Sequence, residues 1–456
     1  MTIRGGLTAG LVLCAGLAPL PFGSHRPWAW SLMAVLMAAL LLCWVVGNWR
    51  GAQLAPVSLG RIRAFAVPFL VVAGWMLVQT LPLGGLLANP LWGEAATALA
   101  SENIQSIHGA ISLAPYDGRT ALMRLASYGI AFWLALQLAR DEAMARAMMR
   151  WLAIICVLYA AVGLFYYYNG IERILWIPKW AYLGDATGTF VNRNAYGAQM
   201  ALGVVLCLGL CLHAFRPHVG ETPMERLRRL IKGGGWLLGG GLCLLAVLAS
   251  HSRGALLACA IAGFVLLLAL AFSGSIRRGT LFWVIAVVFA GAAAILIANG
   301  EATLQRFVGG SDFQGDRPNL VRLSWALVQG APWLGYGLGA FEPALSIVRD
   351  ITLPRPVAYE FAHNMYMEAL VELGVPAAIL WWSGFVLLGW RFLSGLMRRR
   401  HRLYSALGLA ILALFGSHAV VDFSIAMPAL ALMAAILLGI ACAQSWSSRE
   451  DLSTRA

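Results

Sequence analysis

Long apolar runs follow one another along the whole chain, and short polar segments separate them. A helix that crosses a membrane needs about 20 consecutive, mostly apolar residues, so the pattern predicts about twelve membrane-spanning helices. Their expected ranges are 6–22, 27–48, 64–86, 120–139, 148–168, 194–214, 235–250, 254–273, 279–299, 363–396, 403–420 and 423–445. The range 235–250 is short and rich in glycine, whereas 363–396 is too long for one crossing and is expected to project beyond the membrane surface.

The composition agrees with this pattern. Hydrophobic residues make up 60% of the 456 residues, charged residues make up 12%, and the mean hydropathy is +0.76. A soluble domain carries about 25% charged residues, so these values exclude a soluble enzyme, a disordered chain and a disulfide-stapled secreted domain. The long apolar runs also exclude an outer-membrane barrel, whose strands alternate apolar and polar residues. We therefore predict an all-α polytopic membrane protein with a single integral membrane domain over residues 1–456.

The distribution of charge predicts the orientation. The net charge is +13, and most of the basic residues are arginines in alternate loops. In membrane proteins such residues collect in the cytoplasm, which is a simpler explanation than nucleic-acid binding. The intervening segments are longer and more acidic, with Glu94, Asp117, Glu172, Asp185, Glu342 and Asp350 among their residues. Twelve spans then place both termini in the cytoplasm. Residues 1–21 resemble a signal peptide, but we interpret them as a retained first span.

All eight cysteines lie inside apolar runs, and we interpret them as small packing residues. The largest segment outside the membrane is expected over residues 300–362, on the side opposite the termini. It contains a predicted amphipathic helix over 319–329, with Leu320, Trp325 and Val328 as its apolar residues, and a turn follows over 331–337. A second, smaller outer loop is expected over 87–118.

Two arginines are expected at the outer ends of spans. Arg193 stands between Asn192 and Asn194 at the start of the sixth span, and Arg253 follows a very short turn between the seventh and eighth spans. A guanidinium group can donate two parallel hydrogen bonds to phosphate oxygens, so both arginines are candidates for an anion site. The alternatives are an arginine that extends to lipid headgroups at position 193 and a tight hairpin capped by Ser252 at position 253. We expect a structural role for His251.

A histidine opens the tenth predicted span. His363 stands beside Asn364, and an unperturbed imidazole has a pKa of about 6.5, which suits a general base. The alternative is a capping or packing histidine. Glu368 and Glu372 share one helix face and are expected either to orient His363 or an arginine or to hold the helix to a neighbour.

Other charged residues are expected at the same outer face. Asp422 lies in the last outer turn and is expected to pair with an arginine, as charged groups at membrane depth commonly do. The large outer loop offers Arg306, Arg317 and Arg322 as candidates for a third cationic contact. It also contains Asp312 and Asp316, with Gly315 between them, which we interpret as a loop turn. We therefore expect no metal site and no cofactor.

Several motifs together resemble the O-antigen ligase and polymerase superfamily of bacterial inner membranes. They are Thr-Phe-Val-Asn-Arg-Asn at 189–194, Ser-Arg-Gly at 252–254, the run 332–341 with its repeated glycines, Ala-His-Asn at 362–364, Glu-Leu-Gly at 372–374, and Asp422-Phe423 with Pro428. The resemblance covers residues 180–445. Each motif alone is weak, and their order, spacing and predicted topology make the set specific.

The resemblance implies a glycosyltransferase C-type fold, located in the bacterial inner membrane with the active site facing the periplasm. Members transfer a glycan from undecaprenyl diphosphate to an acceptor hydroxyl, with inversion and without a metal. By motif, Arg193 and Arg253 would bind the diphosphate, His363 would lie beside the acceptor, and Arg322 best matches the family's loop arginine. Asn192, Asn194, Asn364, Glu372 and Asp422 would support these groups. The expected partners are the lipid-linked glycan donor, an acceptor and the lipid bilayer, without nucleic acid.

Elementary chemistry agrees with these assignments, because negative charge grows on the departing diphosphate and fixed guanidinium groups stabilise it. We favour lipid A–core as the acceptor, as in an O-antigen ligase. A polymerase that uses a lipid-linked repeat unit, or a protein O-oligosaccharyltransferase, would need the same donor chemistry. A lipid-glycan transporter is a different hypothesis, and the polar groups gathered at one face disfavour it.

Overall fold

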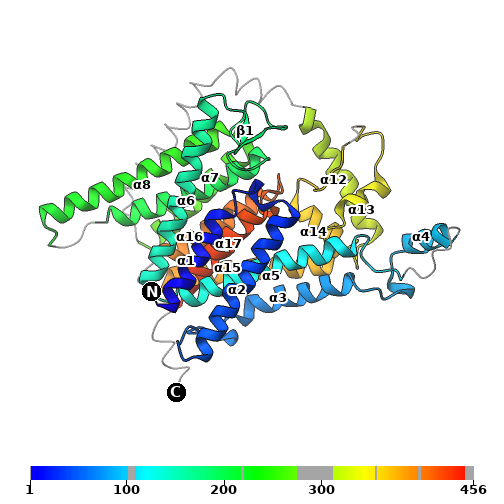
Figure 1. Ribbon diagram of the computed structural model, residues 1–456, viewed down its shortest axis with the longest axis horizontal. Helices are drawn as coiled ribbons and strands as arrows, with labels where there is room; N and C mark the ends of the chain where they lie inside the picture. The colour runs from blue at the N-terminus through cyan, green and yellow to red at the C-terminus, as the bar shows by residue number, and fades with distance from the viewer. Residues whose placement is uncertain are drawn as a thin grey trace. The chain divides into compact units, whose positions relative to one another are not determined.

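The computed structural model describes residues 2–100, 108–216, 220–274, 312–354, 357–398 and 402–446 (Figure 1). This part of the chain is almost entirely helical, which confirms the predicted all-α class. Within it, the only strands are β1 (Arg173–Ile174) and β2 (Ile177–Pro178), which pair as a short antiparallel hairpin.

The chain forms two compact units. Unit 1 consists of Met1–Ala64, Met123–Ser273 and Phe385–Ala456, and unit 2 consists of Phe65–Leu122 and Gly274–Gly384. The helices of unit 1 are α1 (Ile3–Leu17), η1 (Phe22–Ser24), α2 (Pro27–Trp49), α6 (Glu142–Tyr168), α7 (Arg193–Ala214), α8 (Pro223–Ala249), α9 (Arg253–Phe272), α16 (Leu403–His418), η3 (Ser424–Ala426) and α17 (Pro428–Ala443). Those of unit 2 are η2 (Gly85–Leu87), α4 (Leu91–Ala100), α12 (Asp312–Gly330), α13 (Phe341–Val348) and α14 (Met365–Leu373). Residues of α3 (Leu59–Gln79), α5 (Pro115–Leu138) and α15 (Val375–Arg398) belong to both units.

Eight of the described helices are long and apolar enough to cross a membrane, namely α2, α3, α5, α6, α7, α8, α9 and α15. Three shorter apolar helices, α1, α16 and α17, fall at other predicted spans. The chain is therefore a polytopic helical membrane protein. The predicted span 279–299 lies outside the described residues. The span predicted over 235–250 belongs to the longer helix α8, which a capping box between Thr222 and Glu225 begins.

The single helix predicted over 363–396 is wrong. The structure divides this range into α14 and α15 at Gly374, whose φ of +80° and ψ of 160° lie outside the helical region. Glycine adopts such a conformation without the steric cost that a Cβ atom imposes. The excess length noted in the sequence therefore belongs to a separate short helix.

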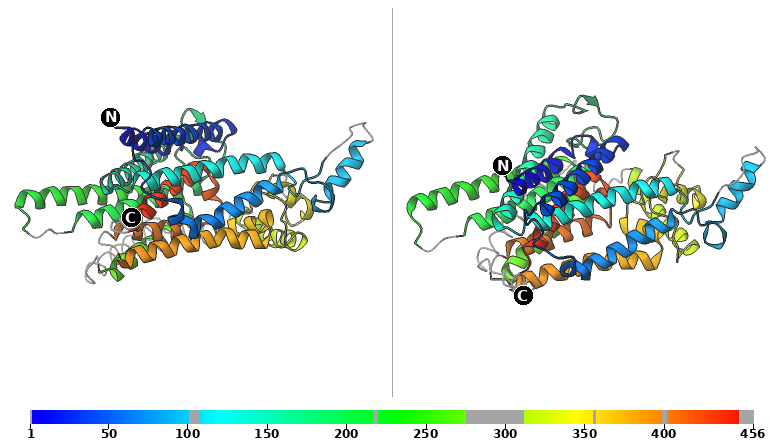
Figure 2. Two further views of the ribbon diagram at one scale, coloured as in Figure 1. Left: turned by 90° about the horizontal axis from the view of Figure 1, so that it is seen from below. Right: turned by 60° about the horizontal axis from the view of Figure 1, so that its bottom comes forward.

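Helix α7 forms the centre of unit 1, where it packs against α6, α8, α9 and α16. Its most apolar window is 83% buried, compared with 17% for α2. Figure 2 shows α7 and α8 running side by side. A Cβ atom on Gly203 of α7 would lie 2.7 Å from the Cys243 sulfur and 2.8 Å from the Cβ of Cys156. Small residues thus bring the helices close together, as is common inside membranes, and these cysteines are packing residues as predicted.

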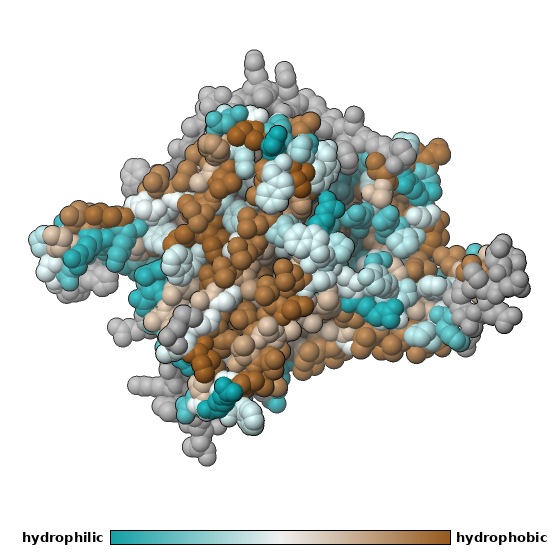
Figure 3. Space-filling model, viewed as in Figure 1, coloured by the Kyte–Doolittle hydropathy of each residue, from teal (hydrophilic) through white to brown (hydrophobic). Residues whose placement is uncertain are grey.

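Large apolar side chains also cover part of the outside of unit 1. In Figure 3, hydrophobic residues gather over α1, α2 and α6. Leu13, Leu32, Val35, Leu42, Leu158 and Phe165 are among the exposed side chains of these helices. An exposed apolar surface of this kind indicates contact with lipid rather than water.

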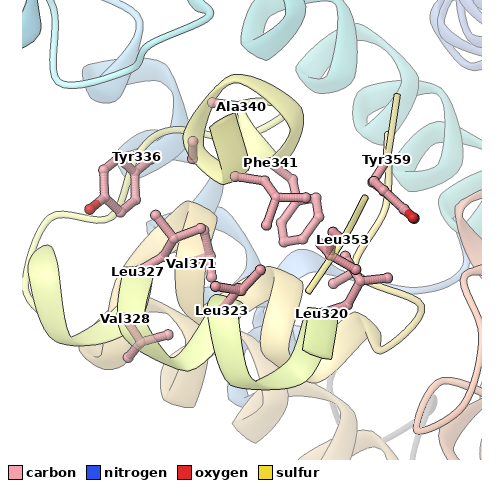
Figure 4. Close-up of a cluster of buried hydrophobic side chains, with 13 residues drawn as sticks. Leu320, Leu323, Leu327, Val328, Tyr336, Ala340, Phe341, Leu353, Tyr359 and Val371 are labelled. Atoms are coloured by element: carbon pink, nitrogen blue, oxygen red, sulfur yellow. The ribbon is translucent and has the colours of Figure 1, made fainter. Parts of the chain in front are cut away.

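In unit 2, α12, α13 and α14 enclose a small hydrophobic core (Figure 4). Leu323 and Leu327 of α12 point toward Phe341 of α13 and Val371 of α14. The amphipathic helix predicted over 319–329 is confirmed as part of α12, although Trp325, an expected apolar contact, is 52% exposed.

The loop turn predicted at Asp312 and Asp316 is wrong. Helix α12 already begins at Asp312, so both residues lie in its first turns. Asp316 accepts a hydrogen bond from the Tyr359 hydroxyl at 2.7 Å, which uses its carboxylate inside the unit.

The glycine turn over 331–337 crosses the break between α14 and α15. The N–H of Val375 donates to the oxygen of Pro332 at 2.8 Å, and the N–H of Gly337 donates to the oxygen of Glu372 at 2.9 Å. Gly335 has a φ of +67°, and a Cβ atom there would lie 2.4 Å from the Glu372 oxygen. Only glycine fits this position, so the turn and the break hold each other in place.

We predict that Gly335→Ala destabilises the protein by about 2–4 kcal/mol, because it combines a left-handed backbone with a backbone clash. The measurement is the thermal unfolding midpoint of the purified chain in detergent. Gly74→Ala is the matched control, because a Cβ atom at Gly74 of α3 meets nothing within 4 Å. Equal midpoints for the two variants would contradict the proposed packing.

Candidate functional site

The loop between α6 and α7 is held in place before it enters α7. The Lys179 ammonium nitrogen lies 2.7 Å from Glu172 Oε2 and donates to the backbone oxygen of Asp185 at 2.8 Å. The N–H of Ala186 donates to the oxygen of Ala249 at 2.9 Å, which joins the loop to the end of α8. These contacts fix the loop on both sides of Asp185 and give the chain a defined entry into α7.

Arg193 and Arg253 each occupy the first position of a helix. Asn192 is the N-cap of α7 and accepts a hydrogen bond from the N–H of Asn194 at 2.7 Å, and Ser252 is the N-cap of α9. The hydroxyl of Ser252 accepts from the N–H of Ala255, so the cap considered as the alternative at this position is present. A helix N-terminus carries a positive partial charge, so each arginine adds to a favourable field for an anion.

Small residues bring the starts of the two helices together. A Cβ atom on Gly197 of α7 would lie 2.8 Å from the Cβ of Ala255 in α9. A Cβ atom on Gly254 would lie 2.9 Å from a methyl carbon of Val421, in the turn that contains Asp422. Larger residues would push these elements apart. The positively charged first residues of α7 and α9 consequently lie close enough for their charges to interact.

Asp185 connects an arginine and a histidine of this region. Its Oδ2 accepts a hydrogen bond from Arg193 NH1 at 2.8 Å, and its Oδ1 lies 2.7 Å from His251 Nδ1. The Asp185 side chain is only 7% exposed. This contact was not predicted, because in the sequence Asp185 is one of several acidic residues of an outer segment. The available signal was a carboxylate eight residues before an arginine at a membrane boundary.

The pKa of Asp185 lies below its ordinary value. Partial burial by itself would raise this pKa, but the hydrogen bond from His251 and the charge of Arg193 outweigh burial. Asp185 is therefore ionised at neutral pH and balances part of the positive charge at the site.

Arg193 has hydrogen-bonding capacity beyond its contact with Asp185. Its Nε is buried and has no hydrogen-bond partner among the residues that the structure describes. The ring of Tyr182 lies 5.5 Å from the guanidinium carbon, a distance suitable for a cation–π contact. The Arg193 side chain is 29% exposed, so part of it is accessible from outside. A guanidinium group can donate to phosphate oxygens, although the buried Nε is not exposed to such a ligand.

Asp422 lies in the same unit and contacts α7. The side-chain amide of Asn194 donates to Asp422 Oδ2, and the hydroxyl of Ser424 donates to Asp422 Oδ1 at 2.8 Å. Asp422 is 2% exposed. The turn that contains Asp422 therefore contacts the first turn of α7 through Asn194.

The other expected site residues lie in unit 2. His363 has a φ of +51° and directly precedes Asn364, whose side chain caps α14 by accepting from the N–H groups of Tyr366 and Met367. A positive φ is uncommon for residues other than glycine and often marks a functional position.

The two glutamates of α14 bind backbone groups of neighbouring segments. Glu368 Oε2 accepts from the N–H of Ala362, and Glu372 Oε1 accepts from the N–H of Gly339, each at 2.9 Å. Burial raises the pKa of Glu368 to about 8, against the smaller opposing effect of the hydrogen bond from Ala362. Glu368 is thus largely protonated at neutral pH.

Arg322 lies on α12 in unit 2 and is 54% exposed. It donates to Asp350 Oδ2 at 2.7 Å and to the Thr352 hydroxyl at 2.9 Å. These hydrogen bonds hold the pKa of Asp350 at about 2. Of the other two candidates for a third cation, Arg317 lies in the first turns of α12 and Arg306 lies outside the described residues.

A small pocket in unit 1 lies beside Asp185. Its polar lining includes Glu172, Lys179, Asp185 and Thr187. In the described part of the chain, no group of three or more His, Cys, Asp or Glu residues is placed to hold a metal ion.

Residues 238–382 match the family model described as O-antigen ligase. The matched segment contains Arg253, Arg322 and His363, whereas Arg193 precedes it and Asp422 follows it. No curated protein matches the chain. The family match confirms the resemblance to the O-antigen ligase superfamily that the motifs predicted.

We predict that Asp185→Asn lowers the stability of the protein by about 1–3 kcal/mol at pH 7, because it weakens two hydrogen bonds to charged or polar partners. The pKa of Asp185 is lowered by folding, so its contribution is present above about pH 4 and is lost as the pH falls through the lowered pKa. The measurement is the difference in thermal midpoint between wild type and variant at pH 7 and pH 3. The difference should shrink in acid.

Glu94→Gln, at an exposed position on α4, is the control and should leave the midpoint unchanged at both pH values. A gap between wild type and Asp185→Asn that is the same at pH 7 and pH 3 would mean that ionisation of Asp185 does not stabilise the site.

Proposed function

We propose that the chain, whose residues 238–382 match the family model described as O-antigen ligase, is a glycosyltransferase of the bacterial inner membrane. It transfers a glycan from undecaprenyl diphosphate to an acceptor hydroxyl, with inversion and without a metal. The favoured acceptor is lipid A–core. Both termini lie in the cytoplasm and the reaction takes place at the periplasmic face, because the arginine-rich loops and the acidic segments alternate along the chain.

The position and hydrogen bonding of Arg193 support this proposal most strongly. Asp185 fixes one terminal nitrogen of the guanidinium group, and Nε remains without a partner in the described part of the chain. Arg193 also stands at a helix N-terminus near the like-charged Arg253. Guanidinium groups at two neighbouring helix starts add to one positive field, which attracts an anion. A lipid diphosphate has the charge and the oxygen spacing to bind such a field.

This arrangement would act on the departing diphosphate. As the acceptor oxygen attacks the anomeric carbon, the bond from that carbon to the phosphate oxygen breaks, and its electron pair stays on the oxygen. Arg193 and Arg253 would stabilise the charge where it develops. The proton of the acceptor hydroxyl would pass to His363, and undecaprenyl diphosphate would leave.

The acceptor distinguishes the closest alternatives. A polymerase would apply the same donor chemistry to a hydroxyl of another lipid-linked repeat unit, and a protein O-oligosaccharyltransferase would use a serine or threonine hydroxyl. Arg193 and Arg253 act on the leaving group, so their loss would abolish the reaction with any of these acceptors.

We predict that deletion of the gene leaves lipid A–core without O-chains, as seen on a gel of the surface polysaccharide. The wild-type gene should restore the O-chains. Arg193→Ala should reduce transfer about 100-fold or more, a loss typical of removing a group that stabilises charge in the transition state. His363→Ala should likewise fail to restore the O-chains.

Arg226→Ala is the matched control, because Arg226 lies at an exposed position in the first turn of α8 and should restore normal O-chains when substituted. Cores that carry a single repeat unit in the deletion strain would indicate a polymerase. An unchanged lipopolysaccharide pattern would rule out the ligase assignment.

A further inference from the structure

The carboxylate that holds Arg193 also holds a histidine with no assigned role. We propose that His251, oriented by Asp185, is a third phosphate ligand of the donor site and that it binds the diphosphate in its protonated form. This inference rests on the proposed function, because it places His251 beside the two arginines that would bind the same diphosphate.

The hydrogen bond to Asp185 determines which nitrogen of His251 is available. An ionised carboxylate can only accept hydrogen bonds. Since His251 Nδ1 lies 2.7 Å from Asp185 Oδ1, Nδ1 carries a proton and donates it to this bond. Nε2 is then the nitrogen on the far side of the ring, and the His251 side chain is 30% exposed. The ring of Tyr167 packs edge-on with a centroid distance of 6.0 Å and further fixes the imidazole.

The backbone at His251 places the imidazole at the start of α9. His251 has a φ of +51°, in the left-handed region, and it immediately precedes the N-cap Ser252. A histidine in this conformation is uncommon, and such strain persists where the surrounding structure requires it. His251 is two residues from Arg253 and shares the carboxylate of Asp185 with Arg193. All three cationic groups therefore gather at the ends of α7 and α9.

The surrounding charges couple protonation of His251 to binding of an anion. An arriving phosphate adds negative charge beside the His251 ring, and a protonated ring in turn attracts phosphate. Phosphate binding and protonation must then strengthen each other by the same factor. The titratable and charged groups around this turn are Tyr167, Lys179, Asp185, Arg193, Arg253 and His418.

A purely structural role for the Asp185–His251 pair would give a different dependence of phosphate binding on pH. If His251 only anchored the loop through Asp185, its removal would lower stability or weaken phosphate binding equally at every pH. A phosphate ligand that binds as imidazolium strengthens binding only where the ring is protonated. The dependence of diphosphate affinity on pH therefore separates the two roles.

The test is calorimetric titration of inorganic diphosphate into the purified full-length chain in detergent, at pH 5.5 and pH 8.0. The key variant is His251→Asn, because asparagine tolerates the left-handed backbone and stays neutral at both pH values. His108→Asn is the matched control, since His108 lies at an exposed position in the other unit. Diphosphate itself also titrates in this range, but equally for every variant, so only the difference between variants is informative.

Between pH 8.0 and pH 5.5, the diphosphate affinity of wild type and of His108→Asn should rise by a factor about ten times larger than that of His251→Asn. A tenfold difference is typical of one charge-assisted hydrogen bond. His251→Lys, whose charge is present at both pH values, should bind well at pH 8.0 and change little with pH. Thermal midpoints of the variants, measured in the same buffers, confirm that each is folded.

Two results would overturn the inference in different ways. If Arg193→Ala loses diphosphate binding while His251→Asn gains as much affinity in acid as wild type, His251 is not a phosphate ligand and the proposed function stands. If Arg193→Ala binds diphosphate as tightly as wild type at both pH values, the donor site itself is misassigned, and both proposals fail.

Discussion

A charged side chain at the end of a membrane helix has to be paired, because leaving it alone in a poorly hydrated environment is costly. In this protein the pairing of Arg193 with Asp185 meets that constraint, and the rest of the site depends on it. The same carboxylate positions His251, and the loop that carries it is fixed by Lys179 and by the end of α8. One ionised carboxylate thereby orients groups from two helix starts, while the Arg193 side chain stays 29% exposed.

The two units hold different parts of the proposed chemistry. Unit 1 carries the cationic groups suited to a diphosphate, at helix starts that glycines allow to approach each other. Unit 2 carries His363 at a strained position before α14, and the Gly335 turn supports the adjoining helix break. A transferase with a charged lipid donor and a neutral hydroxyl acceptor needs these two kinds of environment: one stabilises negative charge and the other accepts a proton.

The sequence predicted the features that depend on local pattern, and it missed those that depend on distant contacts. Apolar runs located the helices, and Arg193 and Arg253 were correctly placed at helix starts. The break at Gly374 was missed because α14 and α15 form one nearly continuous apolar run. The link between Asp185 and His251 joins residues 66 positions apart, and no periodicity encodes it. The ion pair between Arg322 and Asp350 was likewise not predicted, because it joins residues 28 positions apart.

The central claim is that the protein breaks the bond between a glycan and a lipid diphosphate and forms a new one to an acceptor. The most direct measurement uses the purified chain in proteoliposomes with an undecaprenyl-diphosphate-linked glycan and lipid A–core, and mass spectrometry of both products. The account predicts one undecaprenyl diphosphate released for each glycan attached to lipid A–core. Movement of intact donor across the bilayer, with neither release nor attachment, would contradict the account and indicate a transporter.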